Sequence, residues 1–118
     1  MFKFISFGSG SSGNCYYLYT ENGGILIDVG VGTRKLKNHF GDYGLNYFNG
    51  IKAILVTHDH ADHIKSVGSI SKMFDIPVYA TRPVHSGMDS NVCMRSKITH
   101  DRRMYVEPGV SFTIGDFR

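Results

Sequence analysis

Three histidines and two aspartates fall within six consecutive residues of this chain, from His58 to His63. They follow an apolar run, residues 54–56, that is typical of a buried strand. Imidazole and carboxylate groups are ligands that proteins offer to zinc and similar divalent metals. Burying so many charged groups without a cation would be costly, because buried charges need partners. The segment therefore predicts a metal site, with metal-assisted hydrolysis as its chemistry.

The spacing within this segment suggests two neighbouring cations. His58 and His60 are two residues apart after a strand, so both imidazoles can point the same way and reach one cation. Asp62 and His63 lie where the chain enters a helix, with Asp62 as a candidate N-cap, and they can face a second cation. Two such metals can share a bridging hydroxide, which is the nucleophile that these sites use. Asp62 is the residue expected to position that nucleophile and to accept its proton.

Two residues beside these four are expected to have lesser roles. Asp59 is expected to be solvated or to support a ligand. Thr57 either ends the strand or uses its hydroxyl to support a ligand.

The elements that must position this segment follow from hydrophobic patterning and turn signals. Asn22-Gly23-Gly24 predicts a hairpin turn. Thr33 is a candidate helix cap, and Gly41 or Gly44 is the expected end of that helix. A second helix is predicted from the apolar spacing over residues 64–74, and a further helical turn from Thr81. Strands are predicted over residues 2–7, 15–20, 24–29, 52–56, 76–80 and 110–114, while residues 86–103 have no clear assignment.

This order of elements predicts an α+β fold in which helices pack on a mixed sheet. The 118 residues suffice for one domain, and a hydrophobic content of 42% suffices for a packed core. The net charge of +3 permits an anionic substrate. No stretch is long and apolar enough to cross a membrane, and the N-terminus lacks a signal-peptide core. Cys15 and Cys93 have no CxxC spacing, so we expect two small buried residues in a reduced, cytoplasmic protein.

The pattern His58-x-His60-x-Asp62-His63 after a hydrophobic strand resembles the signature of metallo-β-lactamase-fold hydrolases. The resemblance implies an αβ/βα sandwich in which His58 and His60 bind one metal, and Asp62 and His63 a second. The metals implied are zinc or manganese, with iron as an alternative. Asp28 matches the acidic residue that supports the metal-binding loop in that family; its other interpretation is an ordinary turn residue.

Residues 7–18, with their Gly/Ser-rich loop, look like the opening of the YycJ/WalJ-type branch, and residues 25–30 and 54–58 fit the same branch. The resemblance implies a metal-dependent, exonuclease-like enzyme with DNA as its substrate. Ser66 departs from the glycine that often follows the motif, which a helix tolerates.

The family pattern also requires a third histidine for the first metal, a bridging aspartate and a last histidine. His85 and His100 stand in other contexts and are interpreted as ordinary polar residues, and Asp116 comes too early. Residues 1–118 are therefore expected to be the N-terminal half of a single, truncated domain. Such a fragment should have little catalysis by itself, and its uncovered apolar sheet surface should favour self-association.

Substrate signals are weaker. One basic cluster comprises Arg95, Lys97, Arg102 and Arg103, and another lies on residues 34–37. Such residues can contact DNA phosphates, but solvated surface is the favoured interpretation of both clusters. The loop Gly8–Asn14 could present N–H groups to a phosphate, although tight-turn geometry is its favoured role. Alternatives to a nuclease are a thioester or lactone hydrolase of the same fold, and a non-catalytic metal-binding module.

Overall fold

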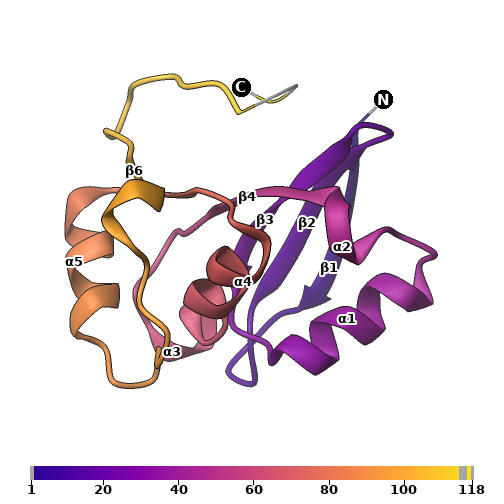
Figure 1. Ribbon diagram of the computed structural model, residues 1–118, viewed down its shortest axis with the longest axis horizontal. Coiled ribbons are helices and arrows are strands. Elements are labelled where there is room, and N and C mark those ends of the chain that lie inside the picture. Colours follow the sequence, from indigo (N-terminus) through magenta and orange to yellow (C-terminus); the bar gives the residue numbers. More distant parts are fainter. Residues whose placement is uncertain (1, 115–116, 118) are drawn as a thin grey trace.

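The computed structural model describes residues 2–114 and 117, and its frame is a six-stranded mixed sheet (Figure 1). The strands lie in chain order, with antiparallel pairing from the first to the third and parallel pairing from the third to the sixth. They are β1 (Lys3–Gly8), β2 (Cys15–Thr20), β3 (Gly23–Val29), β4 (Ile51–Leu55), β5 (Val78–Ala80) and β6 (Arg103–Tyr105). The predicted mixed sheet with flanking helices is confirmed.

The helices contribute to a core that forms against one face of the sheet. Leu36 and Phe40 from the first helix and Ile70 from the fourth are fully buried together with Leu26 and Ile54 from the central strands. Figure 1 shows α1, α2 and α4 on the same side of β1–β4. The helices are α1 (Thr33–Asp42), α2 (Tyr47–Gly50), α3 (Ala61–Ile64), α4 (Val67–Phe74) and α5 (Arg82–Ser90), with a 3₁₀ helix at His100–Arg102.

The helix predicted over residues 64–74 is two helices, α3 and α4, separated at Lys65 and Ser66. The Ser66 N–H donates to the Val29 carbonyl oxygen (2.9 Å) and its hydroxyl donates to the Val31 carbonyl oxygen (2.6 Å). These bonds to the last residue of β3 and to the segment after it replace the bonds of a continuous helix. The predicted apolar face is otherwise correct, since Ile64, Val67 and Ile70 are fully buried.

Two helix starts differ from the predictions, whereas the predicted end of the first helix at Gly44, one of the two glycines proposed, is confirmed. The N-cap of α1 is Gly32, without a side-chain cap, so Thr33 is already helical. Asp62 is not an N-cap either: His60 occupies that position in α3, and Asp62 lies in the first turn. The first helix continues through Gly41 and ends before Gly44, whose φ of 65° continues no helix. The hydroxyl of Thr33 and the carboxylate of Asp62 correctly indicate where each helix begins, but neither residue is the N-cap itself.

The predicted strand over residues 110–114 is wrong. Only an isolated bridge between Ile114 and Phe117 forms there, and β6 lies earlier in the chain. The alternating apolar side chains of this segment cover the second face of the sheet instead: Phe112 stacks on Tyr79, and Ile114 packs with Ile25. Asp116 lies outside the described residues.

Residues 86–103, which the sequence left open, contain the larger part of α5 and a loop. The helical turn predicted at Thr81 is correct, since its side chain accepts a hydrogen bond from the Val84 N–H. The helix then continues to Ser90 and buries His85 and Met88. His85 is therefore a core residue rather than an ordinary polar one.

The two cysteines have different environments. Cys15 is buried, as predicted, and burial, with the charge of Asp28 adding to it, raises the pKa of its thiol. Cys93 is exposed, so the prediction of two buried cysteines is wrong for this residue, which sits in a loop without regular structure. Within the part of the chain that the structure describes, every helix falls short of the length and apolarity needed to span a bilayer.

Candidate metal centre

The candidate ligands gather where two parallel strands end side by side. In the pairing of β3 with β4, Ile27 is the partner of Leu55, so Asp28 and the segment after Leu55 leave the same edge of the sheet. The carboxyl ends of parallel strands are where α/β sheets bind ligands. The chain then turns directly into α3, which carries Asp62 and His63.

The buried carboxylate of Asp28 connects the parts of this centre. Its Oδ1 accepts a hydrogen bond from the Thr57 N–H (2.7 Å), and its Oδ2 accepts one from the Thr57 hydroxyl (2.6 Å). The same Oδ2 contacts His63 Nδ1 at 2.7 Å. Asp28 has a left-handed φ of 60°, which aspartate and asparagine tolerate better than most residues. Backbone and side chain together fit an aspartate that orients neighbours, so the turn-residue interpretation accounts for only part of its role.

These contacts determine which nitrogen of each imidazole is available. A carboxylate only accepts, so His63 Nδ1–H donates to Asp28 and leaves Nε2 with its lone pair free. The Thr57 hydroxyl gives its single hydrogen to Asp28 and can only accept from His58 Nδ1, at 2.9 Å. His58 therefore also presents Nε2 as an acceptor. Thr57 lies two residues beyond the end of β4, so it does not end the strand, and its hydroxyl supports an imidazole.

The four predicted ligands do not converge equally. The potential ligand atoms of Asp28, His58 and His63 lie within 4.8 Å of one another, and the rings of His58 and His63 are 4.8 Å apart. The His58 and His60 rings are 6.0 Å apart, and His60 is exposed. His63 Nε2 lies 3.9 Å from Asp62 Oδ2. Because Asp28 already accepts three hydrogen bonds, we interpret it as a support for the ligands rather than as one of them.

Asn14 holds Asp62 in place, a role that the sequence did not reveal. Its backbone N–H donates to the Asp62 carbonyl oxygen (2.7 Å), and its side-chain Nδ2 donates to Asp62 Oδ2 (3.1 Å). Asn14 is the last residue of the Gly/Ser-rich loop and directly precedes β2. This position is the only feature of the sequence that could indicate its importance. The tight-turn role of the loop agrees with the two hydrogen bonds that join the Asn14 side chain to the Gly10 backbone.

Gly30 allows the three segments of the centre to touch. A Cβ at this position would lie 1.7 Å from the Asp62 carbonyl oxygen and 2.9 Å from the Asn14 nitrogen, and both are backbone atoms. The Gly30 N–H also donates to the Asn14 carbonyl oxygen at 2.8 Å. Segments far apart in the sequence therefore meet at one glycine.

The Asp59 side chain contacts α5 and does not belong to the group formed by Asp28, His58 and His63. Its carboxylate lies against Gly87 of α5, where an added Cβ would come within 1.8 Å of Oδ2. Its carbonyl oxygen accepts from Asn91 Nδ2 at 3.0 Å. Asp59 is half-buried rather than fully solvated, and it attaches residues 58–63 to the end of α5.

The donor set fits a divalent cation. The free Nε2 atoms of His58 and His63 are the kind of ligand that zinc and manganese accept, and each ring is oriented through its other nitrogen, as metal-binding imidazoles usually are. Two ligand atoms on a tetrahedral zinc lie roughly 3.4 Å apart. The 3.9 Å between His63 Nε2 and Asp62 Oδ2 is close to this spacing.

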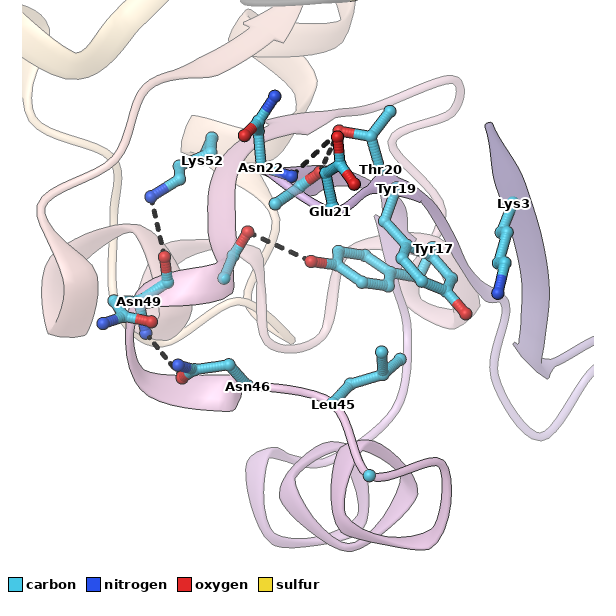
Figure 2. Close-up of a pocket in the computed structure, with 13 residues that line it drawn as sticks. Lys3, Tyr17, Tyr19, Thr20, Glu21, Asn22, Leu45, Asn46, Asn49 and Lys52 are labelled. Atoms are coloured by element: carbon cyan, nitrogen blue, oxygen red, sulfur yellow. Dashed lines mark hydrogen bonds between the residues drawn. The ribbon is translucent and has the colours of Figure 1, made fainter. Parts of the chain in front are cut away.

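A separate cavity of about 610 Å³ lies at the other end of the sheet, around the β2–β3 turn and α2. Figure 2 shows Tyr17 and Tyr19 lining it, with Lys3 and Lys52 among the residues around them. The Tyr17 hydroxyl donates to the Gly50 carbonyl oxygen (3.0 Å), and Lys52 Nζ donates to the Asn49 carbonyl oxygen (2.7 Å). This cavity contains none of the candidate metal ligands.

Comparison with known proteins identifies the family. A family model described as the Beta-lactamase superfamily domain matches residues 24–118. The chain is 34% identical to the exodeoxyribonuclease YycJ of Bacillus anthracis, covering 92% of this chain and 39% of that protein. It is 30% identical to the exodeoxyribonuclease WalJ of Streptococcus pneumoniae, covering 98% of this chain and 42% of that protein. The chain therefore spans about two fifths of the length of these relatives.

Solved structures agree on the fold. A B3 metallo-β-lactamase with an active-site glutamic acid superposes with a TM-score of 0.75 at 20% identity, covering 95% of this chain and 46% of that one. At this identity the likeness concerns the arrangement of strands and helices alone. The family model and the solved structure both agree with the mixed sheet and flanking helices described above.

Proposed function

Because the chain belongs to the β-lactamase superfamily, we propose that the whole protein is a metal-dependent phosphodiesterase that degrades DNA in the manner of an exonuclease. The observation that carries the proposal is the pair of imidazoles held by Asp28, directly and through Thr57, at the end of β4. The 118-residue chain, in this proposal, forms the N-terminal half of one domain. It supplies two ligands to each of two metals and has little activity without further ligands.

Each residue has a proposed part. His58 and His60 hold the first divalent metal, zinc, manganese or iron, and Asp62 and His63 hold the second. Asp28 keeps Nε2 of His63 free by accepting from Nδ1, and Thr57 does the same for His58. Asn14 fixes the carboxylate of Asp62 by donating to Oδ2.

Bound divalent metals would supply an acidified water and neutralise the charge that develops on the phosphate. The Asp62 carboxylate is 34% exposed, so one side can reach an incoming water and receive its proton. Asn14 restricts the rotation of this carboxylate, which keeps the acceptor oxygen in one position.

DNA is the proposed substrate because the two relatives that match over most of this chain are described as exodeoxyribonucleases. The fold alone permits other hydrolytic chemistry, since the superposed structure is a β-lactamase.

The test is an assay of the full-length protein with 5′-labelled linear duplex DNA and Mn²⁺ or Zn²⁺, beside a panel of thioesters and lactones. We expect metal-dependent release of nucleotides from DNA and a loss of at least 100-fold in His60→Gln, as expected for removal of a metal ligand. His100→Gln, which changes another exposed histidine, should retain activity. Cleavage of thioesters or lactones alone would replace the nuclease proposal, and metal binding without any hydrolysis would favour a non-catalytic module.

A further inference from the structure

A groove of about 690 Å³ lies against α3, and its lining includes Ala61, the residue between His60 and Asp62, but none of the four candidate ligands themselves. One wall consists of Ala61 at the start of α3, Lys65 between the two helices and Ser69 in α4. Asp62 and His63 also lie in α3, so the groove borders the helix that carries two candidate ligands. The opposite walls are the start of α1 and residues 92–95. We call this the α3 groove.

Two cations line the α3 groove without partners in the described part of the chain. Lys65 and Arg95 are both exposed, and neither forms a hydrogen bond or ion pair with a described residue. No acidic side chain is among the described residues that line the groove. Lys65 and Arg95 are 30 positions apart in the sequence, so the fold rather than a charge run brings them to one groove.

The other basic residues near Arg95 have structural roles. Arg102 pairs with Asp75 at 2.8 Å, and Arg103 pairs with Asp89 at 3.0 Å. Lys97 Nζ donates to the carbonyl oxygens of Met88 and Asn91. The basic cluster that the sequence suggests is therefore mostly a network that holds the chain together, and Arg95 is the member left for a ligand.

The wall that carries Arg95 is attached to the metal-binding segment. Met94 is 1% exposed and anchors the loop in the core. Asn91 donates from Nδ2 to the Asp59 carbonyl oxygen, and its Oδ1 accepts from the Cys93 N–H. The position of the wall is thus fixed relative to Asp59, which is the neighbour of His58 and His60.

We propose that the α3 groove binds the phosphates of a single DNA strand that leads to the metal centre, with Lys65 and Arg95 as the contacting cations. The inference rests on the proposed function, because the groove matters only if the neighbouring centre acts on a polyanion. The groove volume is within the range of small-molecule sites, and the proposed occupant is a short stretch of one strand. Each cation that contacts a phosphate adds a salt-dependent increment to affinity.

The experiment measures binding without cleavage. Full-length protein in EDTA is titrated against a fluorescein-labelled 12-nucleotide single strand, and anisotropy gives Kd at several KCl concentrations. For Lys65→Gln/Arg95→Gln we expect affinity roughly tenfold lower near 0.1 M KCl and a slope of log K against log [KCl] shallower by about 1.4, which is 0.7 for each lost phosphate contact.

The matched control is Lys3→Gln/Lys52→Gln. It removes the same charge from the cavity in Figure 2, at the other end of the sheet, and should bind the strand like the unmodified protein. An equal loss in both double variants would indicate only general charge attraction and would overturn the proposal. Unchanged binding in Lys65→Gln/Arg95→Gln would overturn it as well.

Cys93 supplies a second readout within the groove. It is exposed and lines the α3 groove, whereas Cys15 is buried with a raised thiol pKa, so a maleimide should react at Cys93 first. Mass spectrometry of the Cys93 peptide should show slower labelling when the strand is added, but not in Lys65→Gln/Arg95→Gln. Equal protection by millimolar inorganic phosphate would contradict a strand path.

The two proposals fail separately. If the full-length protein does not cleave DNA, but the strand still slows labelling of Cys93, the nuclease function alone is rejected. Cleavage with no effect of the double variant on binding would reject the α3 groove alone.

Discussion

Asp28 places one demand on the backbone and another on the side chain. Its φ of 60° requires a residue that tolerates the left-handed region, and its carboxylate accepts from Thr57 and His63. Asparagine satisfies the first demand and not the second, because its amide nitrogen cannot accept the His63 proton. The two roles can therefore be separated by one substitution.

Asp28→Asn is expected to lower metal affinity of the full-length protein by about 10- to 100-fold, as loss of a residue that orients a ligand usually does. Isothermal titration with Zn²⁺ and Mn²⁺ measures the effect. Asp75→Asn is the control, because Asp75 has a similar φ of 53° but is exposed and pairs with Arg102. Unchanged affinity in Asp28→Asn would mean that Asp28 does not orient the imidazoles.

At the scale of residues, the sequence predicted most of the candidate centre because its members are neighbours. The four candidate ligands fall within six consecutive residues, and histidine and aspartate side chains alone suggest metal ligands: His58, His60, Asp62 and His63. Asn14 could not be found in this way, because its bond to Asp62 spans 48 positions and asparagine is common in loops. Whether the four residues bind metal as assigned stays a prediction.

At the scale of elements, the β3–α1 connection constrains α3. Gly30→Ala would push a Cβ into the backbone of Asp62, which no side-chain rotation can relieve. We expect the free energy of unfolding to fall by about 1–3 kcal/mol or more, as for overpacked sites, together with weaker metal binding. Urea denaturation measures the first effect.

Gly41→Ala is the comparison for that variant. Gly41 lies inside α1 with no heavy atom within 4 Å of an added Cβ, so alanine should stabilise the protein by roughly 0.5–1 kcal/mol. Equal stability of the two variants would contradict the close contact at Gly30.

His85 links two strands from α5. Its Nε2 lies 3.1 Å from the Val78 carbonyl oxygen and 3.0 Å from the Met104 carbonyl oxygen, so Nε2–H donates between β5 and β6. Nδ1 is buried without a partner among the described residues. Burial lowers the pKa of His85, with Arg103 contributing, although the two backbone bonds oppose the shift.

This lowered pKa predicts a dependence of stability on pH. The unfolded chain binds the proton more tightly than the folded one, so the stability from neutral His85 is fully present above the ordinary value of 6.5 and is lost as pH falls below it. Urea unfolding of the protein at pH 7.5 and 5.5 should show a smaller loss in His85→Gln, which keeps a donor nitrogen without the charge. An identical pH dependence in both proteins would contradict the shift.

Elements were predicted where the signal is local and missed where tertiary contacts decide. The strands from 2–29 and 52–56 follow from alternation and from the turn at Asn22 and Gly23. The break between α3 and α4 depends on Ser66 bonding to Val29 and Val31, which lie more than 30 positions away. The segment 110–114 has the alternation of a strand, but it pairs with no strand and packs across the sheet face instead.

At the scale of the whole molecule, the two faces of the sheet differ. The helices cover one face, while the other carries half-buried Leu18 and Tyr79, which pack with Phe112, Ile114 and Phe117, and an exposed Phe4 that stacks on Tyr16. Figure 1 shows residues 106–114 returning from β6 toward the end of the sheet where β1 begins. Apolar surface that is left uncovered promotes association.

We therefore expect purified residues 1–118 to self-associate with increasing concentration, and Phe4→Ser to weaken this association. Sedimentation velocity over a tenfold concentration range measures it. Phe48→Ser is the control, because Phe48 is 67% exposed on α2, on the helical side. A monomer at all concentrations, or an equal effect of both substitutions, would contradict association through the sheet face.

The shared oxygen of Asp28 has a consequence for metal loading. One atom, Oδ2, orders His63 directly and His58 through Thr57, and these imidazoles are assigned to different metals. When a metal binds one imidazole, that side chain and the Asp28 carboxylate lose mobility. The other imidazole, held by the same oxygen, is then already partly ordered, so binding the second metal costs less conformational entropy, without any movement of the backbone. The two metal positions should consequently fill cooperatively rather than independently.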